Sequence, residues 1–315
     1  MFRSRPTDSW DVRPRASWTM GRHRSPVRGG PSLVDRCGGR RNEGRYGPGM
    51  TLRVCVAGAT GWTGRPVAAA VHEADDLDLR SAVSRSSAGA DLGLVWGGEP
   101  NGVRVFGRVP DALDDVDVLV DYTSHEAVRA NGLAAIDRGV SVVIGSSGLG
   151  AADFAEIDGA ARQAGVGVVA AGNFSLTAAM AQAAAVLVAR YLPNREIIDY
   201  ASAGKPDAPS GTARELAERL AIVNTTVLEV PVDQIGEHVQ ARGVTVAGTQ
   251  VHSLRLPSFV VSTEVVFALP DERLVIRHDA GPTPTPYVAG TLLATRAAAR
   301  LTGLVRGLDT LLLDQ

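Results

Sequence analysis

The sequence predicts an α/β protein in which a doubly wound parallel sheet is joined to a smaller α+β domain with a mixed sheet. The first observation behind this prediction is a glycine-rich turn between an apolar run and a helix-like run near residue 58. The second is a series of short, almost wholly apolar runs that alternate with helical periodicity up to about residue 174. The third is a change, after residue 195, to longer runs rich in Val and Thr, which indicates strands that follow one another.

The glycine-rich turn is the strongest local signal for a bound nucleotide. The apolar run Arg53–Ala57 leads directly into Gly58–Gly64, and a helix-like run from Arg65 to Ala74 follows. Glycines permit a tight turn and let the backbone approach a pyrophosphate at the helix N-terminus. This order of elements favours a Rossmann-like, dinucleotide-binding domain, although such a turn also occurs without a ligand. The candidate cofactor contacts in the turn are Gly58, Ala59, Thr60, Gly61, Trp62 and Thr63.

The end of the second predicted strand, residues 78–83, carries the information about which cofactor is used. It leads into Ser84-Arg85-Ser86-Ser87, with no acidic residue. An aspartate or glutamate there would hold the ribose 2′-hydroxyl of NAD, whereas an arginine among hydroxyl groups suits a 2′-phosphate. The sequence therefore predicts NADPH, with NADH possible and Arg85 as the phosphate partner; the alternative is a solvated loop arginine.

Three further apolar runs read as strands of the same sheet, buried on both faces. They are residues 116–122, 140–144 and 166–170, and helices are expected over 125–138, where Ser124 can act as the cap, and over 151–164. The carboxyl ends of parallel strands form the ligand crevice of such a sheet. The small and hydroxyl-bearing residues that follow these three runs are therefore predicted to line a crevice: Asp121-Tyr122-Thr123-Ser124, Gly145-Ser146-Ser147-Gly148 and Ala171-Gly172-Asn173-Phe174-Ser175.

After an Ala-rich helix at 175–191, the pattern changes to that of a second domain. Strands are predicted over residues 196–202, 244–255, 259–269 and 273–279, with a helix at 212–222. An Ala/Leu helix over 287–301 returns to the pattern of the first domain. We predict a dinucleotide-binding domain formed by residues 51–174 and 286–315, and a second domain formed by residues 175–285.

Lys205 is the only lysine of the chain, whereas all 31 other Lys or Arg positions are arginine. It opens the stretch Lys205–Ala213, in which two prolines stiffen the backbone and Ser210-Gly211-Thr212 begins a helix. Free N–H groups at a helix start, beside an ammonium group, suit a carboxylate or a phosphate. The alternative is a capped surface helix after a proline-rich loop.

Charge is distributed unevenly along the chain. Residues 1–49 hold 11 arginines against 4 acidic residues and lack periodicity, so residues 1–50 are predicted to be a disordered basic leader, which need not be translated because Met50 could be the start. Nucleic-acid binding and an organellar presequence are the alternatives, but the prolines disfavour a presequence helix and the acidic remainder disfavours nucleic acid. No apolar run is long enough for a membrane helix. Two distant cysteines indicate a cytoplasmic protein with no metal site.

From about Leu52 to the C-terminus, the chain resembles the dihydrodipicolinate reductase family, most specifically in Lys205–Ala213. The resemblance implies NAD(P)H-dependent reduction of a carboxylated cyclic imine in diaminopimelate and lysine biosynthesis, by a homotetramer assembled through the sheets of the second domain. It implies that Lys205 is a proton donor or carboxylate partner. The implied substrate contacts are Ser210, Gly211 and Thr212, and the implied cofactor contacts are Gly58 to Thr63, Arg85, Thr123, Gly145, Ser146, Ser147, Ala171, Gly172, Asn173 and Phe174.

The resemblance breaks just before the lysine. Family members carry a pair of histidines four and three residues before it, whereas this chain has Ala201 and Ser202. General acid catalysis is worth roughly 10²–10⁴ in rate, so the proton must come from Lys205, Tyr200 or water if the reaction is the same. Two alternatives remain open: a paralogue that reduces a different imine or enone, and a catalytically silent NADPH-binding protein.

Overall fold

The computed structural model describes residues 40–41, 50–236 and 239–313. Most of the predicted basic leader lies outside these residues. Within it, Arg40–Arg41 (β1) pairs antiparallel with the edge strand β13 (Leu301–Arg306) of the first sheet.

The first sheet has the strand order β1-β13-β7-β6-β5-β2-β3-β4, and all of its strands except β1 run parallel. The chain moves outward in one direction from β2 to β4, and then in the other direction from β5 to β7. The sheet is therefore doubly wound, as predicted, with its switch point between β2 and β5. The bounds are β2 (Leu52–Ala57), β3 (Leu77–Val83), β4 (Val105–Phe106), β5 (Val118–Asp121), β6 (Ser141–Ile144) and β7 (Gly167–Ala170).

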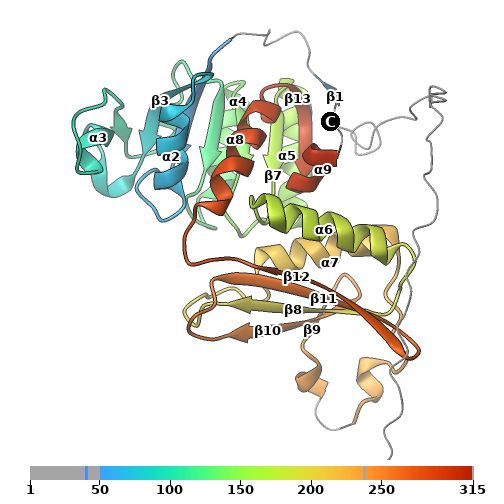
Figure 1. Cartoon of the computed structure of the whole chain (residues 1–315). Coiled ribbons are helices and arrows are strands. Elements are labelled where there is room, and N and C mark those ends of the chain that lie inside the picture. The colour runs from blue at the N-terminus through green and yellow to red at the C-terminus, as the bar shows by residue number, and fades with distance from the viewer. Residues whose placement is uncertain (1–39, 42–49, 237–238, 314–315) are drawn as a thin grey trace, which may run out of the picture. The chain divides into compact units, whose positions relative to one another are not determined.

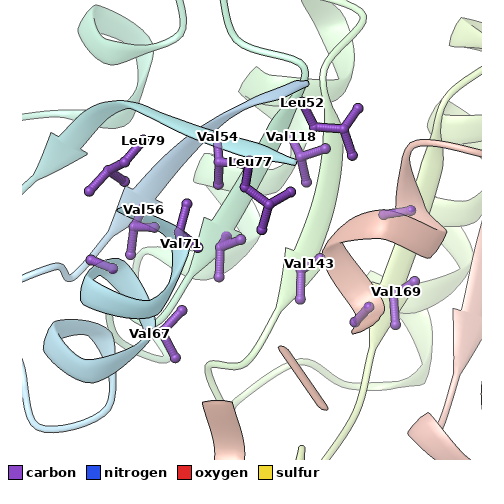
Figure 2. Close-up of a cluster of buried hydrophobic side chains, with 14 of the residues drawn as sticks. Leu52, Val54, Val56, Val67, Val71, Leu77, Leu79, Val118, Val143 and Val169 are labelled. Atoms are coloured by element: carbon purple, nitrogen blue, oxygen red, sulfur yellow. The ribbon is translucent and has the colours of Figure 1, made fainter. Parts of the chain in front are cut away.

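Helices cover both faces of this sheet, which explains why its strands are apolar throughout. On β2, Val54 and Val56 pack in a cluster with residues of α2, whereas Cys55 and Ala57 pack in a second cluster with residues of α4 and α5. Figure 2 shows the first cluster, in which strand valines meet Val67 and Val71. The helices are α2 (Gly64–Glu73), α4 (Val128–Asp137), α5 (Ala151–Ala164), α8 (Pro286–Ala298) and α9 (Leu308–Leu313).

The second sheet is mixed and has the strand order β12-β11-β8-β10-β9. Only the β8–β10 pair is parallel. Two helices, α6 (Leu176–Ala189) and α7 (Gly211–Val223), pack on one face of it and lie between the two sheets (Figure 1). The bounds are β8 (Arg195–Ala201), β9 (Val244–Val246), β10 (Thr249–Arg255), β11 (Val261–Leu269) and β12 (Glu272–Asp279). The short elements are α3 (Leu92–Val95), η1 (Arg85–Ser87), η2 (Val109–Ala112), η3 (Val232–Gln234) and η4 (Val239–Arg242).

The structure corrects the sequence prediction at three places. The strand predicted over 244–255 is two antiparallel strands joined at Ala247 and Gly248, which both have positive φ. The predicted helix 287–301 ends at Ala298, and β13 follows it. The helix predicted to start at His125 starts at Val128, and the carbonyl oxygen of Ser124 accepts the N–H groups of Ala127 and Val128. In the described part of the chain, no helix is long and apolar enough to cross a bilayer.

Candidate functional site

The glycine turn packs the start of α2 so closely that side chains are excluded. Gly58 has a φ of +82° and donates its N–H to the Val83 carbonyl oxygen at 2.9 Å. A Cβ atom on Gly58 would clash with the Tyr122 carbonyl oxygen, and one on Gly64 would clash with the carbonyl oxygen of Gly58. These two glycines therefore permit the tight turn and the close packing of the start of α2, an arrangement that places a helix N-terminus where this fold binds a pyrophosphate.

Arg85 lies at the end of β3, on the first residue of η1, and its side chain is exposed. The Oγ atom of the preceding residue, Ser84, lies 2.8 Å from Thr60 Oγ1 and 3.3 Å from Ser86 Oγ. Three hydroxyl groups thus lie together beside the glycine turn, and Arg85 is the next residue after Ser84 in the chain; a 2′-phosphate site here stays a prediction.

Asp121, at the end of β5, ties neighbouring strand ends together. Its fully buried carboxylate accepts hydrogen bonds from Thr123 N and Oγ1, from Ser146 Oγ at 2.9 Å and from Asn131 Nδ2 at 2.8 Å. Two predicted cofactor contacts, Thr123 and Ser146, are therefore positioned by one carboxylate. Sequence reasoning placed Asp121 at the strand end without giving it this role.

A cavity of about 270 Å³ lies where the ends of β6 and β7 meet the start of α7. It brings together residues from four predicted segments: Trp62, Thr63, Gly145, Ser146, Ser147, Ala171, Gly172, Asn173, Phe174, Lys205, Ser210, Gly211 and Thr212. The remaining predicted cofactor residues do not line it: Gly58, Ala59, Thr60, Gly61, Arg85 and Thr123. The strand ends and the lysine loop thus share one space, whereas Arg85 lies outside that space.

Lys205 lines this cavity and is held by its own loop. Its Nζ atom lies 2.7 Å from Asp207 Oδ1, and both side chains are mostly buried. Burial raises the pKa of the Asp207 carboxyl, but the hydrogen bond and charge of Lys205 outweigh it, so the pKa lies below its ordinary value. Asp207 is therefore a carboxylate that fixes the ammonium group at the cavity.

A second buried carboxylate, Asp199 on β8, holds the rest of the loop. Asp199 accepts hydrogen bonds from Ser210 N at 2.8 Å and Ser210 Oγ at 2.6 Å. Arg255 on β10 donates to Asp199 Oδ2 at 2.8 Å and to the Asp207 carbonyl oxygen at 2.7 Å. Ser210 Oγ also accepts the Ala213 N–H as the N-cap of α7. The Ser210 hydroxyl is thus committed to the protein, and its side chain positions Gly211 and Thr212.

The start of α7 is joined to the loop after β7 through a single residue, Gly172. The Gly172 N–H donates to Glu215 Oε2, and its carbonyl oxygen accepts from Thr212 Oγ1 at 2.8 Å. Glu215 also accepts from Gln182 Nε2 at 3.2 Å, and burial raises the pKa of this glutamate. Both backbone polar groups of Gly172 are occupied within the protein, and a Cβ atom there would crowd Glu215 and Gly211, so this glycine lets α7 pack closely against the loop. A contact of Gly172 with a cofactor stays a prediction.

Tyr200 is not placed to give a proton in the cavity. It does not line the cavity, and its hydroxyl donates to Glu264 Oε2 at 3.3 Å. The guanidinium of Arg277 lies 4.9 Å from its ring centroid. The hypothesis that Tyr200 gives the proton is therefore wrong. Successive side chains of a strand point to opposite faces, and the buried Asp199, which precedes Tyr200, faces α7.

Several cavity residues were missed by sequence reasoning. Trp62 and Tyr287 form an edge-to-face aromatic pair with centroids 6.1 Å apart, and Tyr122 and Phe174 form another. The face of α7 that starts at Gly211 also contributes charged side chains. The missed lining residues include Phe154, Arg214, Glu215, Glu218, Tyr287 and Arg306. The only available signal was the helical spacing from Gly211, which is weak without a known cavity.

A glycine turn on a doubly wound sheet, facing a second domain across the strand ends, is the arrangement found in dinucleotide-dependent oxidoreductases. Residues 52–174 match the family model for the N-terminal part of dihydrodipicolinate reductase, and residues 173–312 match the model for its C-terminal part. The chain belongs to the dihydrodipicolinate reductase family.

Individual relatives agree with this assignment. The 4-hydroxy-tetrahydrodipicolinate reductase of Moorella thermoacetica is 37% identical over 265 residues, which are 83% of this chain and 98% of the relative. The enzyme of the same name from Thermosynechococcus vestitus is 36% identical, with 83% and 97% covered. The dipicolinate-bound dihydrodipicolinate reductase of Paenisporosarcina sp. TG-14 superposes with a TM-score of 0.65 at 26% identity, covering 82% of this chain and 99% of that structure.

Proposed function

We propose that this protein is an NADPH-dependent reductase of a carboxylated cyclic imine, and that its substrate is 4-hydroxy-tetrahydrodipicolinate. The observation that carries the proposal is the shared cavity. It places Lys205, Gly211 and Thr212 of the second domain against the strand ends of the nucleotide domain. The activity named for the relatives needs this juxtaposition of a carboxylate site and a cofactor site.

Each part of the cavity has a separate proposed role in binding the cofactor, binding the substrate or supplying the proton. The glycine turn fits a dinucleotide, because Gly58 and Gly64 let the turn and the start of α2 pack closely, which leaves the helix N-terminus to face a pyrophosphate. The reduced nicotinamide, when bound, supplies the hydride. The first-turn N–H groups of Gly211 and Thr212 have no acceptor within their own helix and are directed at a substrate carboxylate. Lys205 then supplies the proton that balances the hydride, and Asp207 holds the ammonium group in place.

The proposed preference for NADPH over NADH rests on Arg85. We expect Arg85→Ala to weaken NADPH binding at least tenfold and to leave NADH binding unchanged, because only NADPH carries the 2′-phosphate. The matched control is Arg80→Ala, since Arg80 is an arginine of the preceding strand paired with Asp115. Titration of both cofactors with all three proteins measures this. An unchanged NADPH preference in Arg85→Ala removes Arg85 from the cofactor site.

The experiment that tests the activity is a substrate panel with NADPH. We expect oxidation of NADPH with the product of dihydrodipicolinate synthase. One observation favours the alternative of a paralogous reductase with a different substrate. Ala201 is fully buried and Ser202 is exposed, so neither position offers an acid to the substrate. Turnover only with other cyclic imines or enones would identify a paralogous reductase. Tight NADPH binding without any turnover would identify a catalytically silent protein.

We also propose a homotetramer that assembles through the second sheet and works in the cytoplasm. The face of this sheet opposite α6 and α7 carries Ile198, Tyr200 and Val266, together with Val275, which is 44% exposed. Register places Val275 of β12 opposite Val266 of β11, so these two apolar side chains lie side by side on neighbouring strands. An apolar pair on an uncovered sheet face supports association with further copies.

A further inference from the structure

One face of α7 brings three charged side chains to the cavity. Gly211, Arg214, Glu215 and Glu218 all line the cavity, and they are spaced by three, four and seven residues. That spacing places them on one face of a helix. Arg214 therefore lies on the cavity side of α7 by two criteria, its lining position and its place in the helical repeat.

The other charged groups of this wall already have protein partners. Glu218 pairs with Arg306 at 2.9 Å, and the Arg306 guanidinium also lies 4.1 Å from the Phe154 ring centroid. Lys205 pairs with Asp207, and Glu215 is bound by Gly172 and Gln182. The side chain of Arg214 is exposed. Among the residues that the structure describes, no carboxylate lies within ion-pair distance of it.

Arg214 is also close enough to act on the lysine loop. Its positive charge is one of the contributions that hold the pKa of Asp207 below its ordinary value. Three cations thus line the cavity: Lys205 and Arg306 are paired with carboxylates of the protein, and Arg214 is not. A ligand with a single carboxylate would satisfy the site at Gly211 and Thr212 and leave Arg214 without an anion.

We propose that Arg214 binds the second carboxylate of a dicarboxylate substrate and makes the enzyme selective for dicarboxylates. This inference rests on the proposed function, because it takes the first carboxylate to lie at Gly211 and Thr212. A guanidinium suits the role, since its planar fork matches the two oxygens of a carboxylate.

The test compares two inhibitors that differ by one carboxylate. Pyridine-2,6-dicarboxylate and pyridine-2-carboxylate are titrated into the NADPH-loaded wild type and into Arg214→Ala. We expect Arg214→Ala to weaken binding of the dicarboxylate about tenfold to a hundredfold, which is the range for a lost hydrogen bond to a charged group. Binding of the monocarboxylate should be unchanged. Arg214→Lys should recover part of the loss.

The controls separate this inference from the proposed function. Arg190→Ala removes an exposed arginine at the end of α6, which is not a cavity residue, and should change neither inhibitor. If Arg214→Ala weakens both inhibitors equally, or neither, the selective role is wrong. If the wild type fails to turn over 4-hydroxy-tetrahydrodipicolinate but the selective loss is seen, the proposed substrate is wrong and the dicarboxylate site stands.

Discussion

At the scale of single residues, the side chain that we propose as the proton donor could be found from the sequence, but the residues that hold it could not. Lys205 stood out because it is the only lysine, and its nearest partner, Asp207, lies in the same short motif. Asp199 and Arg255 fix that motif from 11 and 48 residues away. A pattern of neighbouring residues carries no information about such distant partners. The charge of Arg214 could be read from the sequence, but its freedom from a carboxylate partner could not.

Lys205→Ala tests the role of the ammonium group. We expect kcat to fall about 10²–10⁴-fold, because the variant lacks the acid that we assign to proton transfer. NADPH binding should be unchanged, since the glycine turn and Arg85 are untouched. Steady-state kinetics and a cofactor titration measure the two effects. A variant as active as the wild type would remove Lys205 from the mechanism.

Asp207→Asn tests the ion pair through its pH dependence. The pKa of Asp207 is lowered in the folded protein, so its carboxylate contributes stability above the pKa of the unfolded chain. That contribution is lost as the pH falls through the folded-state pKa. The wild type should therefore be the more stable protein at pH 7, and the difference should shrink in acid. Denaturant unfolding at both pH values measures it, and a difference independent of pH would contradict the assignment.

At the scale of elements, local pattern predicted the strand–turn–helix units well and failed at one atypical turn and at one strand with a distant partner. The predicted helix 151–164 has the bounds of α5, and the glycine turn lies between β2 and α2 as expected. The β9–β10 hairpin was missed because its turn is Ala247-Gly248, and alanine is not a usual residue at positive φ. β13 was missed because it is defined by pairing with β7, more than 130 residues earlier.

The joint between α7 and the loop after β7 gives a prediction at this scale. Glu215→Ala should lower kcat at least tenfold, because the Gly172 N–H loses its acceptor and the loop is no longer fixed against Thr212. Glu215→Gln keeps an acceptor for this N–H and should recover most of the activity. The primary deuterium isotope effect with deuterated NADPH should also change in Glu215→Ala. Loss of active protein alone would leave the isotope effect as in the wild type.

At the scale of the whole molecule, the division into two sheets was predictable, but the place where they meet was not. Each sheet could be recognised from its own pattern of strands, because burial on two faces leaves continuous apolar runs, whereas burial on one face leaves alternation. The cavity depends on α6 and α7 lying between the sheets, which no local pattern encodes (Figure 1). The assignment of cavity residues to cofactor and substrate remains a prediction at this scale.

Assembly through the second sheet can be tested by disrupting the apolar pair of Val266 and Val275. The wild type should have the mass of four chains in light scattering after size-exclusion chromatography. Val275→Arg should give a smaller species, because a guanidinium would be buried without a partner at the contact. Leu187→Arg is the matched control on α6, where the side chain is 56% exposed and away from the sheet face. A Val275→Arg protein with the wild-type mass would place the interface elsewhere.

The central claim is that one cavity joins a nicotinamide cofactor to a carboxylated cyclic imine. A single-turnover stopped-flow experiment tests it most directly, with enzyme in excess over NADPH and with 4-hydroxy-tetrahydrodipicolinate freshly made by its synthase. The account predicts rapid loss of the 340 nm absorbance of all bound NADPH, and a much slower loss in Lys205→Ala. NADPH that binds tightly but keeps its absorbance in the presence of this substrate would contradict the account.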